Sequence, residues 1–422
     1  MSLIEVIALL ISLTAVLAYA NHRWIKLPTT IGVMLAALAL SLGLLILDAA
    51  GVHLRDPAKE ILESLKFDEA LMTIMLSFLL FAGALHVNLE DLARQRWVIA
   101  LLATIGVMTS TALVGTASFY FFKMFGFDVP FIFCLLFGAL ISPTDPIAVL
   151  GILKTAGAPK TLETKVVGES LFNDGIGVVV FIVLFEIAVE GRDPSAGHIA
   201  VLFAEEAIGG AILGFILGWI AYQMLKTVDN YTVEVLITLA LVMGGYALAT
   251  ALHMSGPIAM VVAGLLIGNH GRTFAMSEKT REHLDTFWEL VDEVLNAVLF
   301  VFIGLEIIVL ALSGKHLLAG LIAFPVLLLC RFVAVGLPIT FLKKSHQFSP
   351  GVIKILTWGG IRGGISVALA LSIPAQIKAG EVMVDSPRDV ILTVTYVIVV
   401  MSILLQGLTI GKLVQKVSQS EQ

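Results

Sequence analysis

The sequence predicts an all-α polytopic membrane protein with about 13 transmembrane helices, in which two inverted six-helix repeats place unwound crossing helices in the core. Of its 422 residues, 58% are hydrophobic and only 14% are charged, whereas a soluble domain is nearer half apolar and a quarter charged. Apolar segments close to the 20 residues that a membrane-spanning helix needs recur along the chain. Two of these segments, seven spans apart, are interrupted by proline or glycine, which is typical of inverted-repeat transporters.

The apolar segments follow one another with short polar connections. The predicted spans are 3–20, 29–47, 69–86, 97–122, 131–153, 163–189, 198–225, 231–252, 256–269, 288–312, 316–342, 350–377 and 389–412. The ninth span is short, and the tenth has an amphipathic lead-in. We find no segment that alternates apolar and polar residues as a barrel strand does, which excludes a transmembrane β-barrel.

The orientation of the chain is predicted from its ends and its charged loops. The first span has no small-residue cleavage site, so we expect a retained helix rather than a signal peptide. Loops on the side of the first connection carry fifteen Lys and Arg residues, against eight on the opposite side. Because positively charged loops stay in the cytoplasm, we expect the N-terminus outside and a short cytoplasmic tail at 413–422.

Two spans contain residues that interrupt a helix. The fifth reads SPTDPIAV, with Pro143 and Pro146 on either side of Thr144 and Asp145, and the twelfth reads GGIRGGIS around Arg362. Proline and glycine weaken helices, and irregular backbone at membrane depth survives only where it lines a cavity or is buried in protein. An odd offset of seven spans makes the two halves point in opposite directions. The predicted repeats are 1–190 (spans 1–6) and 231–412 (spans 8–13), joined by a linker helix at 198–225 (span 7).

Five charged residues lie well inside predicted spans, where each costs about 2.5–3.5 kcal/mol at a helix centre. They are Asp145, Glu169, Asp174, Arg331 and Arg362. Glu169 and Arg331 can form a structural ion pair, and Arg362 can offset partial negative charge from the carbonyl ends of half-helices. Three carboxylates and two guanidinium groups give this set a charge of −1. One monovalent cation or one proton neutralises it, which predicts a site that exchanges the two.

The sixth span reads GESLFNDG, in which Glu169 and Asn173 are four residues apart, as are Ser170 and Asp174. One helix face therefore carries four oxygen-bearing side chains, and hard cations prefer oxygen ligands. The unwound backbone beside Thr144 can add carbonyl oxygens from the facing helix. Asp174, Asn173, Ser170 and the backbone beside Thr144 are therefore candidate ligands of a monovalent cation.

Other classes of function find little support in the sequence. The net charge is −6 and no run is rich in Lys and Arg, so we expect membrane lipid rather than nucleic acid as a partner. Cys134 and Cys330 lie in apolar runs, where packing is the expected role, and two cysteines build no disulfide framework. Gly210, Gly214 and Gly218 predict close packing of the linker helix. We find no nucleotide loop, HExxH or Ser-His-Asp pattern, so we expect a transporter without a cofactor and not an enzyme.

The motifs SPTDPIAV, GESLFNDG and GGIRGGIS, in this order and on these spans, resemble the cation/proton antiporters of the NhaP/NHE type. The resemblance implies a homodimer, with a dimerisation domain (spans 1–3 and 8–10) and a core transport domain (spans 4–6 and 11–13) in each subunit. It implies that Asp174 binds the cation and the proton in turn. The residues implied to help form the site are Thr144, Asp145, Ser170 and Asn173. Glu169 is implied to pair with Arg331, and Arg362 matches the second core arginine.

The resemblance also bears on stoichiometry and location. Asn173 stands where electrogenic relatives carry a second aspartate, which favours electroneutral one-for-one exchange, in agreement with the charge sum. The chain lacks the long cytoplasmic tail of animal members, which favours a prokaryotic inner membrane. We therefore expect an antiporter that exchanges Na⁺ or Li⁺ for H⁺ in pH homeostasis.

Three alternatives stay open from the sequence. A K⁺/H⁺ antiporter of the same fold is one, because nothing in the sequence fixes the radius of the site. A cation channel is another, although the concentration of charges in one layer favours a carrier. A membrane enzyme is the third, and no catalytic constellation in the sequence supports it.

Overall fold

The computed structural model describes residues 3–53, 55–63, 75–145, 149–150, 153, 158–189, 191–192, 195–310, 313–343, 348, 351–379 and 382–419. Within these ranges almost all of the chain is helical, and seven helices are long and apolar enough to cross a membrane. Three shorter apolar helices accompany them among the same residues. The protein is therefore a multi-pass helical membrane protein, as the sequence predicts.

The first half of the chain contains the helices of predicted spans 1–6. They are α1 (Leu3–Ala20), α2 (Thr29–Leu47), α5 (Leu76–Leu85), α7 (Arg96–Leu101), α8 (Val107–Met124), α9 (Phe131–Leu140) and α11 (Lys160–Val189). Two short helices, α3 (Arg55–Glu63) and α6 (Leu89–Arg94), lie in the connections, and π-helical turns form η1 (Asn21–Ile25), η2 (Asp48–Val52) and η4 (Leu102–Gly106). Residues 69–74 of the third predicted span lie outside the described residues, as do 146–148 and 151–152 of the fifth, Pro146 included.

The second half contains the linker and predicted spans 8–13. The linker is α12 (Ala196–Ala204), η5 (Glu205–Gly209) and α13 (Gly210–Leu225). The elements that follow are α14 (Tyr231–Ala251), α15 (Gly256–Leu266), η6 (Ile267–Gly271), α16 (Arg272–Phe274), α17 (Glu278–Glu306), α18 (Gly314–Leu342), α19 (Val352–Trp358), α20 (Gly364–Leu371), β1 (Gln376–Ala379), β2 (Val382–Asp385), α21 (Arg388–Met401), η7 (Ser402–Gln406) and α22 (Gly407–Gln419).

Polar residues in the connections determine where several of these helices begin. Asn230 Oδ1 accepts the N–H groups of Thr232 and Val233 at the start of α14, at 3.1 and 3.4 Å. Ser277 and Ser313 cap α17 and α18 in the same way. Because a helix leaves its first N–H groups without partners inside the helix, such caps stabilise its start. The predicted start of span 8 at 231 coincides with this cap.

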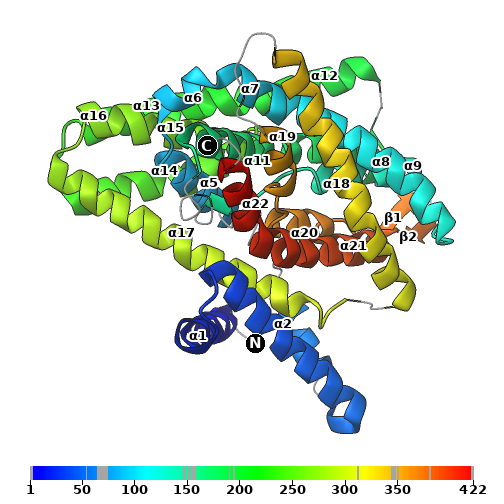
Figure 1. Cartoon of the computed structure of the whole chain (residues 1–422). Helices are drawn as coiled ribbons and strands as arrows, with labels where there is room; N and C mark the ends of the chain where they lie inside the picture. Colours follow the sequence, from blue (N-terminus) through cyan, green and yellow to red (C-terminus); the bar gives the residue numbers. More distant parts are fainter. Residues whose placement is uncertain are drawn as a thin grey trace.

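The helices pack in two groups. In one group α2 packs along α17, α1 lies beside both, and α15 packs against α5, α13 and α14. In the other, α9 packs against α8 and α11, while α18 and α20 pack against α21. Figure 1 shows the dark blue α1 and α2 at one end of the molecule, next to the long α17. A Cβ atom on Gly214 of α13 would lie 2.3 Å from the Ala259 carbonyl of α15, so the linker helix packs as closely as its small residues predict.

Two elements differ from the sequence prediction. The twelfth predicted span, 350–377, ends inside an antiparallel hairpin in which Gln376 pairs with Asp385 and Ala379 with Val382. The hairpin escapes prediction because four-residue strands are too short to reveal an alternating pattern. The tenth predicted span begins at 288, whereas α17 begins at Glu278. The amphipathic lead-in belongs to the same helix because Ser277 caps it ahead of that segment.

The set of five charged residues inside spans is also incomplete. Lys165 on α11, Glu234 on α14 and Glu306 on α17 are 4%, 0% and 2% exposed. All three lie within two turns of a helix end, where the sequence suggests contact with water. Neighbouring helices cover them, and none of the three is among the residues that line the cavity described below.

Candidate cation site

The two interrupted spans meet at their breaks. Helix α9 ends at Leu140, and the chain is non-helical from Pro143 to Asp145; residues 360–363 are likewise non-helical between α19 and α20. The backbone N–H of Asp145 donates to the carbonyl oxygen of Ile361 at 2.8 Å. Neither backbone group has a partner within a helix, so each break supplies the hydrogen-bond partner that the other break lacks. This contact holds the two unwound segments together.

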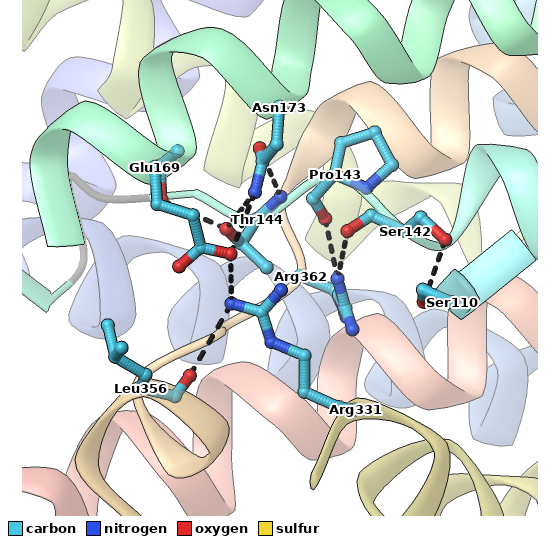
Figure 2. A network of polar contacts seen from close by, with 10 residues as sticks. Ser110, Ser142, Pro143, Thr144, Glu169, Asn173, Arg331, Leu356 and Arg362 are labelled. Atoms are coloured by element: carbon cyan, nitrogen blue, oxygen red, sulfur yellow. Dashed lines mark hydrogen bonds and ion pairs between the residues drawn. The ribbon is translucent and has the colours of Figure 1, made fainter. Parts of the chain in front are cut away.

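Arg362 lies at this crossing and is 1% exposed. Its Nη1 donates to the carbonyl oxygens of Ser142 and Pro143 at 2.5 and 2.9 Å (Figure 2). Its backbone N–H donates to Ser402 Oγ at 3.0 Å. The two carbonyls follow the C-terminal end of α9, where a helix carries partial negative charge. The guanidinium group therefore offsets the negative end of a half-helix at the break.

Glu169 and Arg331 form a buried ion pair. Arg331 Nη2 lies 2.5 Å from Glu169 Oε1, and the two side chains are 5% and 2% exposed. The same nitrogen donates to the carbonyl oxygen of Leu356 at 3.4 Å (Figure 2). A Cβ atom on Gly360 would lie 2.8 Å from Arg331 Nε, so the arginine packs directly against the glycine-rich break. The pair links α11, α18 and the end of α19.

Asn173 of α11 forms hydrogen bonds with Thr144 in the unwound part of the fifth span. Its Oδ1 accepts the backbone N–H of Thr144 at 3.2 Å, and its Nδ2 donates to Thr144 Oγ1 at 2.9 Å and to Glu169 Oε1 at 3.3 Å. Thr144 Oγ1 also lies 2.9 Å from Ser170 Oγ. These contacts turn the Asn173 amide toward the unwound segment. Asn173 and Ser170 hold Thr144 in position.

A cavity of about 70 Å³ lies where the breaks face α5, α11 and α17. Thr144, Asp145 and Asp174 line it, whereas Asn173 and Ser170 do not. Asp174 is 5% exposed. The Asp145 carboxylate lies against Gly363, because a Cβ atom there would come within 2.6 Å of Oδ2. Two carboxylates and a threonine thus face one small cavity, and oxygen ligands of this kind suit a hard cation.

Two further polar residues line this cavity and were missed in the sequence. Asn296 comes from α17 and Ser366 from α20, and they are 2% and 1% exposed. The rest of the lining is largely apolar and comes from α5, α11, α17 and α20. An uncharged polar residue in an apolar helix is common, so neither stands out in one sequence. The available signals are the position of Ser366 inside GGIRGGIS and that of Asn296 four residues after Asp292.

A second cavity, of about 200 Å³, lies next to the first. It is lined by Gly83, His86, Val87, Asn88, Asp91, Leu150, Lys160, Glu163, Thr164 and Val167. Lys160 Nζ and Asp91 Oδ2 form an ion pair within this lining at 3.0 Å. Gly83 of α5 lines both cavities, so the two cavities share this residue. We call this second cavity the polar cavity. Asn88, Asp91 and Lys160 in its lining belong to connections on the side that is rich in Lys and Arg.

Comparison with known proteins places this geometry in context. Residues 11–416 match the family described as sodium/hydrogen exchanger, transmembrane. The chain is 51% identical over 420 residues to the Na⁺/H⁺ antiporter NhaP of Pseudomonas aeruginosa, covering 98% of this chain and 97% of that protein. It is 34% identical to the Na⁺/H⁺ antiporter NhaH of Halobacillus dabanensis, covering 98% and 97%. The structure of the sodium proton antiporter MjNhaP1 from Methanocaldococcus jannaschii at pH 8 superposes with a TM-score of 0.77 at 21% identity, covering 98% of both chains.

Proposed function

Since this chain belongs to the transmembrane sodium/hydrogen exchanger family, we propose that it is a secondary active antiporter that exchanges Na⁺ or Li⁺ for H⁺. The observation that carries the proposal is the cavity at the crossing of the two unwound segments, which Asp174 and Asp145 both line. The proposed location is the inner membrane of a prokaryote, with the N-terminus outside and the C-terminus in the cytoplasm. The count of Lys and Arg residues in and next to the predicted connections, fifteen on the side of the first connection and eight on the other, supports that orientation.

Asp174 is the proposed shared carrier. It lies on α11 inside the membrane-spanning part of the chain, is almost wholly buried and lines the cavity directly. A carboxylate in such surroundings is costly while it is charged and has no partner. It therefore holds either a proton or a cation when the site crosses the membrane. Asp145 and Thr144 add oxygen ligands from the opposite wall, and Asn173 and Ser170 position Thr144.

The local charges support one-for-one exchange. Glu169 and Arg331 neutralise each other as a pair, and Arg362 donates to two helix-end carbonyls. With Asp145 and Asp174 the five groups sum to −1. One Na⁺ or one H⁺ brings the sum to zero, so the same net charge crosses in both directions. The sum covers the two carboxylates that line the cavity and the three charged groups that pair with or contact the residues at the breaks. Lys165, Glu234 and Glu306 are not among these groups.

The two packing groups of helices support a division of the subunit into a transport domain and a dimerisation domain. The group with α8, α9, α11, α18, α20 and α21 carries both breaks and corresponds to the proposed core transport domain. The group with α1, α2, α5, α14, α15 and α17 corresponds to the proposed dimerisation domain of a homodimer. The cavity lies where these groups meet, so displacement of one against the other would change which side of the membrane it faces. No cofactor enters this cycle.

Proton flux in proteoliposomes tests the proposal. We expect Na⁺ and Li⁺, added in turn to vesicles that hold a pH gradient, to release protons, and K⁺ to have no effect. Asp174→Asn in the same vesicles is the control for leakage. Release by K⁺ alone would favour the K⁺/H⁺ antiporter. A Na⁺ current without proton movement would favour a channel.

A further inference from the structure

Two oxygen atoms in the cavity are buried and have no hydrogen-bond partner among the described residues. They are Asn296 Oδ1 on α17 and Ser366 Oγ on α20. Both residues line the cavity with Asp145 and Asp174. Leaving a buried polar atom without a partner costs stability, and a native structure rarely tolerates it without a functional reason. Other buried polar atoms among the described residues also have no hydrogen-bond partner, but of these residues only Asn296 and Ser366 line the cavity. A ligand bound there can therefore reach both oxygen atoms.

The orientation of the Asn296 amide follows from a hydrogen bond to the backbone of its own helix. Its Nδ2 donates to the backbone carbonyl oxygen of Asp292 at 2.8 Å. Because a carbonyl oxygen only accepts, the nitrogen has to occupy that end, which leaves Oδ1 as the atom without a partner. An amide turned the other way would offer an N–H to the carboxylates. The observed arrangement adds an acceptor to a cavity that two carboxylates already line, and a bound cation can be coordinated by all of these oxygen atoms together.

The two residues belong to different groups of helices. Ser366 lies on α20, which follows directly on the second break and packs mainly against α21, and less closely against α9 and α17. Asn296 lies on α17, which packs mainly against α2, α5 and α14. The cavity is therefore closed by one oxygen from each side of the boundary between the groups. Any displacement of the groups changes the distance from Asn296 to Asp174, while Ser366 keeps its place beside Asp145.

The cavity has a second cavity beside it on one side. Gly83 joins it to the polar cavity lined by His86, Asp91 and Glu163, which lies toward the positively charged loops. A Cβ atom on Gly83 would meet nothing closer than Leu171 Cδ1 at 4.0 Å, so the backbone there is not tightly covered. Asn88, Asp91 and Lys160 in the lining of the polar cavity belong to the connections on the proposed cytoplasmic side. We therefore assign the conformation described here to a site that approaches that face, and Asn296 lines the site in this conformation.

We propose that Asn296 and Ser366 are ligands of the transported cation, and that Asn296 binds it only while the site faces the cytoplasm. This inference rests on the proposed antiport function. It predicts an asymmetry: loss of Asn296 weakens cation binding from the cytoplasmic face alone, whereas loss of Ser366 weakens it from both faces.

The test measures half-saturating Na⁺ from each face separately, in everted and right-side-out membrane vesicles. For Asn296→Ala we expect an increase of about tenfold at the cytoplasmic face, the loss typical of one interaction with a charged group, and no change at the outer face. Ser366→Ala should raise both values. Thr357→Val is the matched control, because Thr357 Oγ1 is also buried without a partner among the described residues but does not line the cavity. It should change neither value.

A binding measurement separates a lost ligand from a damaged fold. Na⁺ raises the melting temperature of a protein that binds it in the folded state, so each purified variant is melted with and without Na⁺. Asn296→Ser, which keeps a shorter oxygen, should give an intermediate shift if Asn296→Ala is too unstable to purify. Wild-type affinity at both faces in the Asn296 variants would overturn the ligand role, and equal weakening at both faces would overturn the asymmetry. Absence of Asp174-dependent Na⁺ exchange in the unmodified protein would instead overturn the proposed function itself.

Discussion

The backbone N–H of Asp145 donates to the carbonyl oxygen of Ile361 at 2.8 Å, which joins two segments more than two hundred residues apart at the points where their helices break. The side chain of Asp145 projects from one of these segments into the cavity. Its position is therefore set by backbone that has no helical hydrogen bonds of its own. This arrangement explains why both breaks occur at the same depth as the buried charges.

The first prediction concerns Asp174. Asp174→Asn keeps the shape of the side chain but removes the negative charge and the ability to exchange a proton. We expect the variant to fold with a melting temperature close to that of the wild type, and to lose Na⁺-driven proton flux in proteoliposomes. Substantial flux in this variant would mean that another carboxylate carries the ion, and Asp145→Asn would then be the next variant to measure.

The second prediction concerns the ion pair of Glu169 and Arg331. Glu169→Ala leaves the Arg331 charge buried without its partner and removes the acceptor of Asn173 Nδ2, which should cost about 3–5 kcal/mol. Ser170→Ala removes one hydroxyl from the same helix and is the matched control. Glu169→Ala should therefore lower the melting temperature much more than Ser170→Ala. Equal melting curves for the two variants would contradict a structural role for the pair.

The third prediction follows from the contacts of Asn173. Its Nδ2 donates to Thr144 Oγ1 and Glu169 Oε1, and an ionised aspartate cannot donate. In Asn173→Asp the new carboxylate repels Glu169 unless it holds a proton. The difference in melting temperature between wild type and variant should therefore grow as the pH rises. A constant difference across the pH series would mean that the new side chain turns away from Glu169.

Much of this site is predictable from the sequence because charged residues inside apolar spans are conspicuous. Asp174, Asp145 and Arg362 stand out in this way, and helical spacing alone places Glu169 and Asn173 on one face. Spacing does not say which way a side chain turns. The predicted ligand Asn173 directs its amide to Thr144, whereas Asn296, from a helix far along the chain, lines the cavity. That choice depends on how α11 and α17 approach the breaks, which is decided by tertiary packing.

The boundaries of the helices are likewise only partly predictable from the sequence. Spans such as 29–47 and 231–252 are predictable to within a residue, because a proline or a capping residue stands directly before the apolar segment and marks the start of the helix. The hairpin of β1 and β2 is not predictable, since each of its strands has only four residues. The carbonyl acceptors of Arg362 are also not predictable, because Ser142 and Pro143 become acceptors only where the two breaks cross.

The fourth prediction concerns pH. If one carboxylate takes either ligand, protons compete with Na⁺ for it without any separate sensor. Half-saturating Na⁺ should therefore increase as the pH falls, by up to about tenfold per pH unit in the limit of simple competition. The maximal rate at saturating Na⁺ should change much less. A half-saturating concentration that is independent of pH would exclude a shared carboxylate and would direct attention to a separate regulatory site.

The last prediction concerns membrane potential. The five core charges sum to −1, and either one Na⁺ or one H⁺ brings the loaded site to zero. Moving one net charge across the membrane is worth about 2.3 kcal/mol per 100 mV, so an electrogenic cycle would respond strongly to voltage. We expect an imposed potential to leave the direction and extent of Na⁺/H⁺ exchange unchanged in proteoliposomes. Vesicles clamped at zero potential are the control, and they should give the same Na⁺ distribution. A Na⁺ gradient that builds up in response to potential alone would mean that a further titrating group crosses with the site.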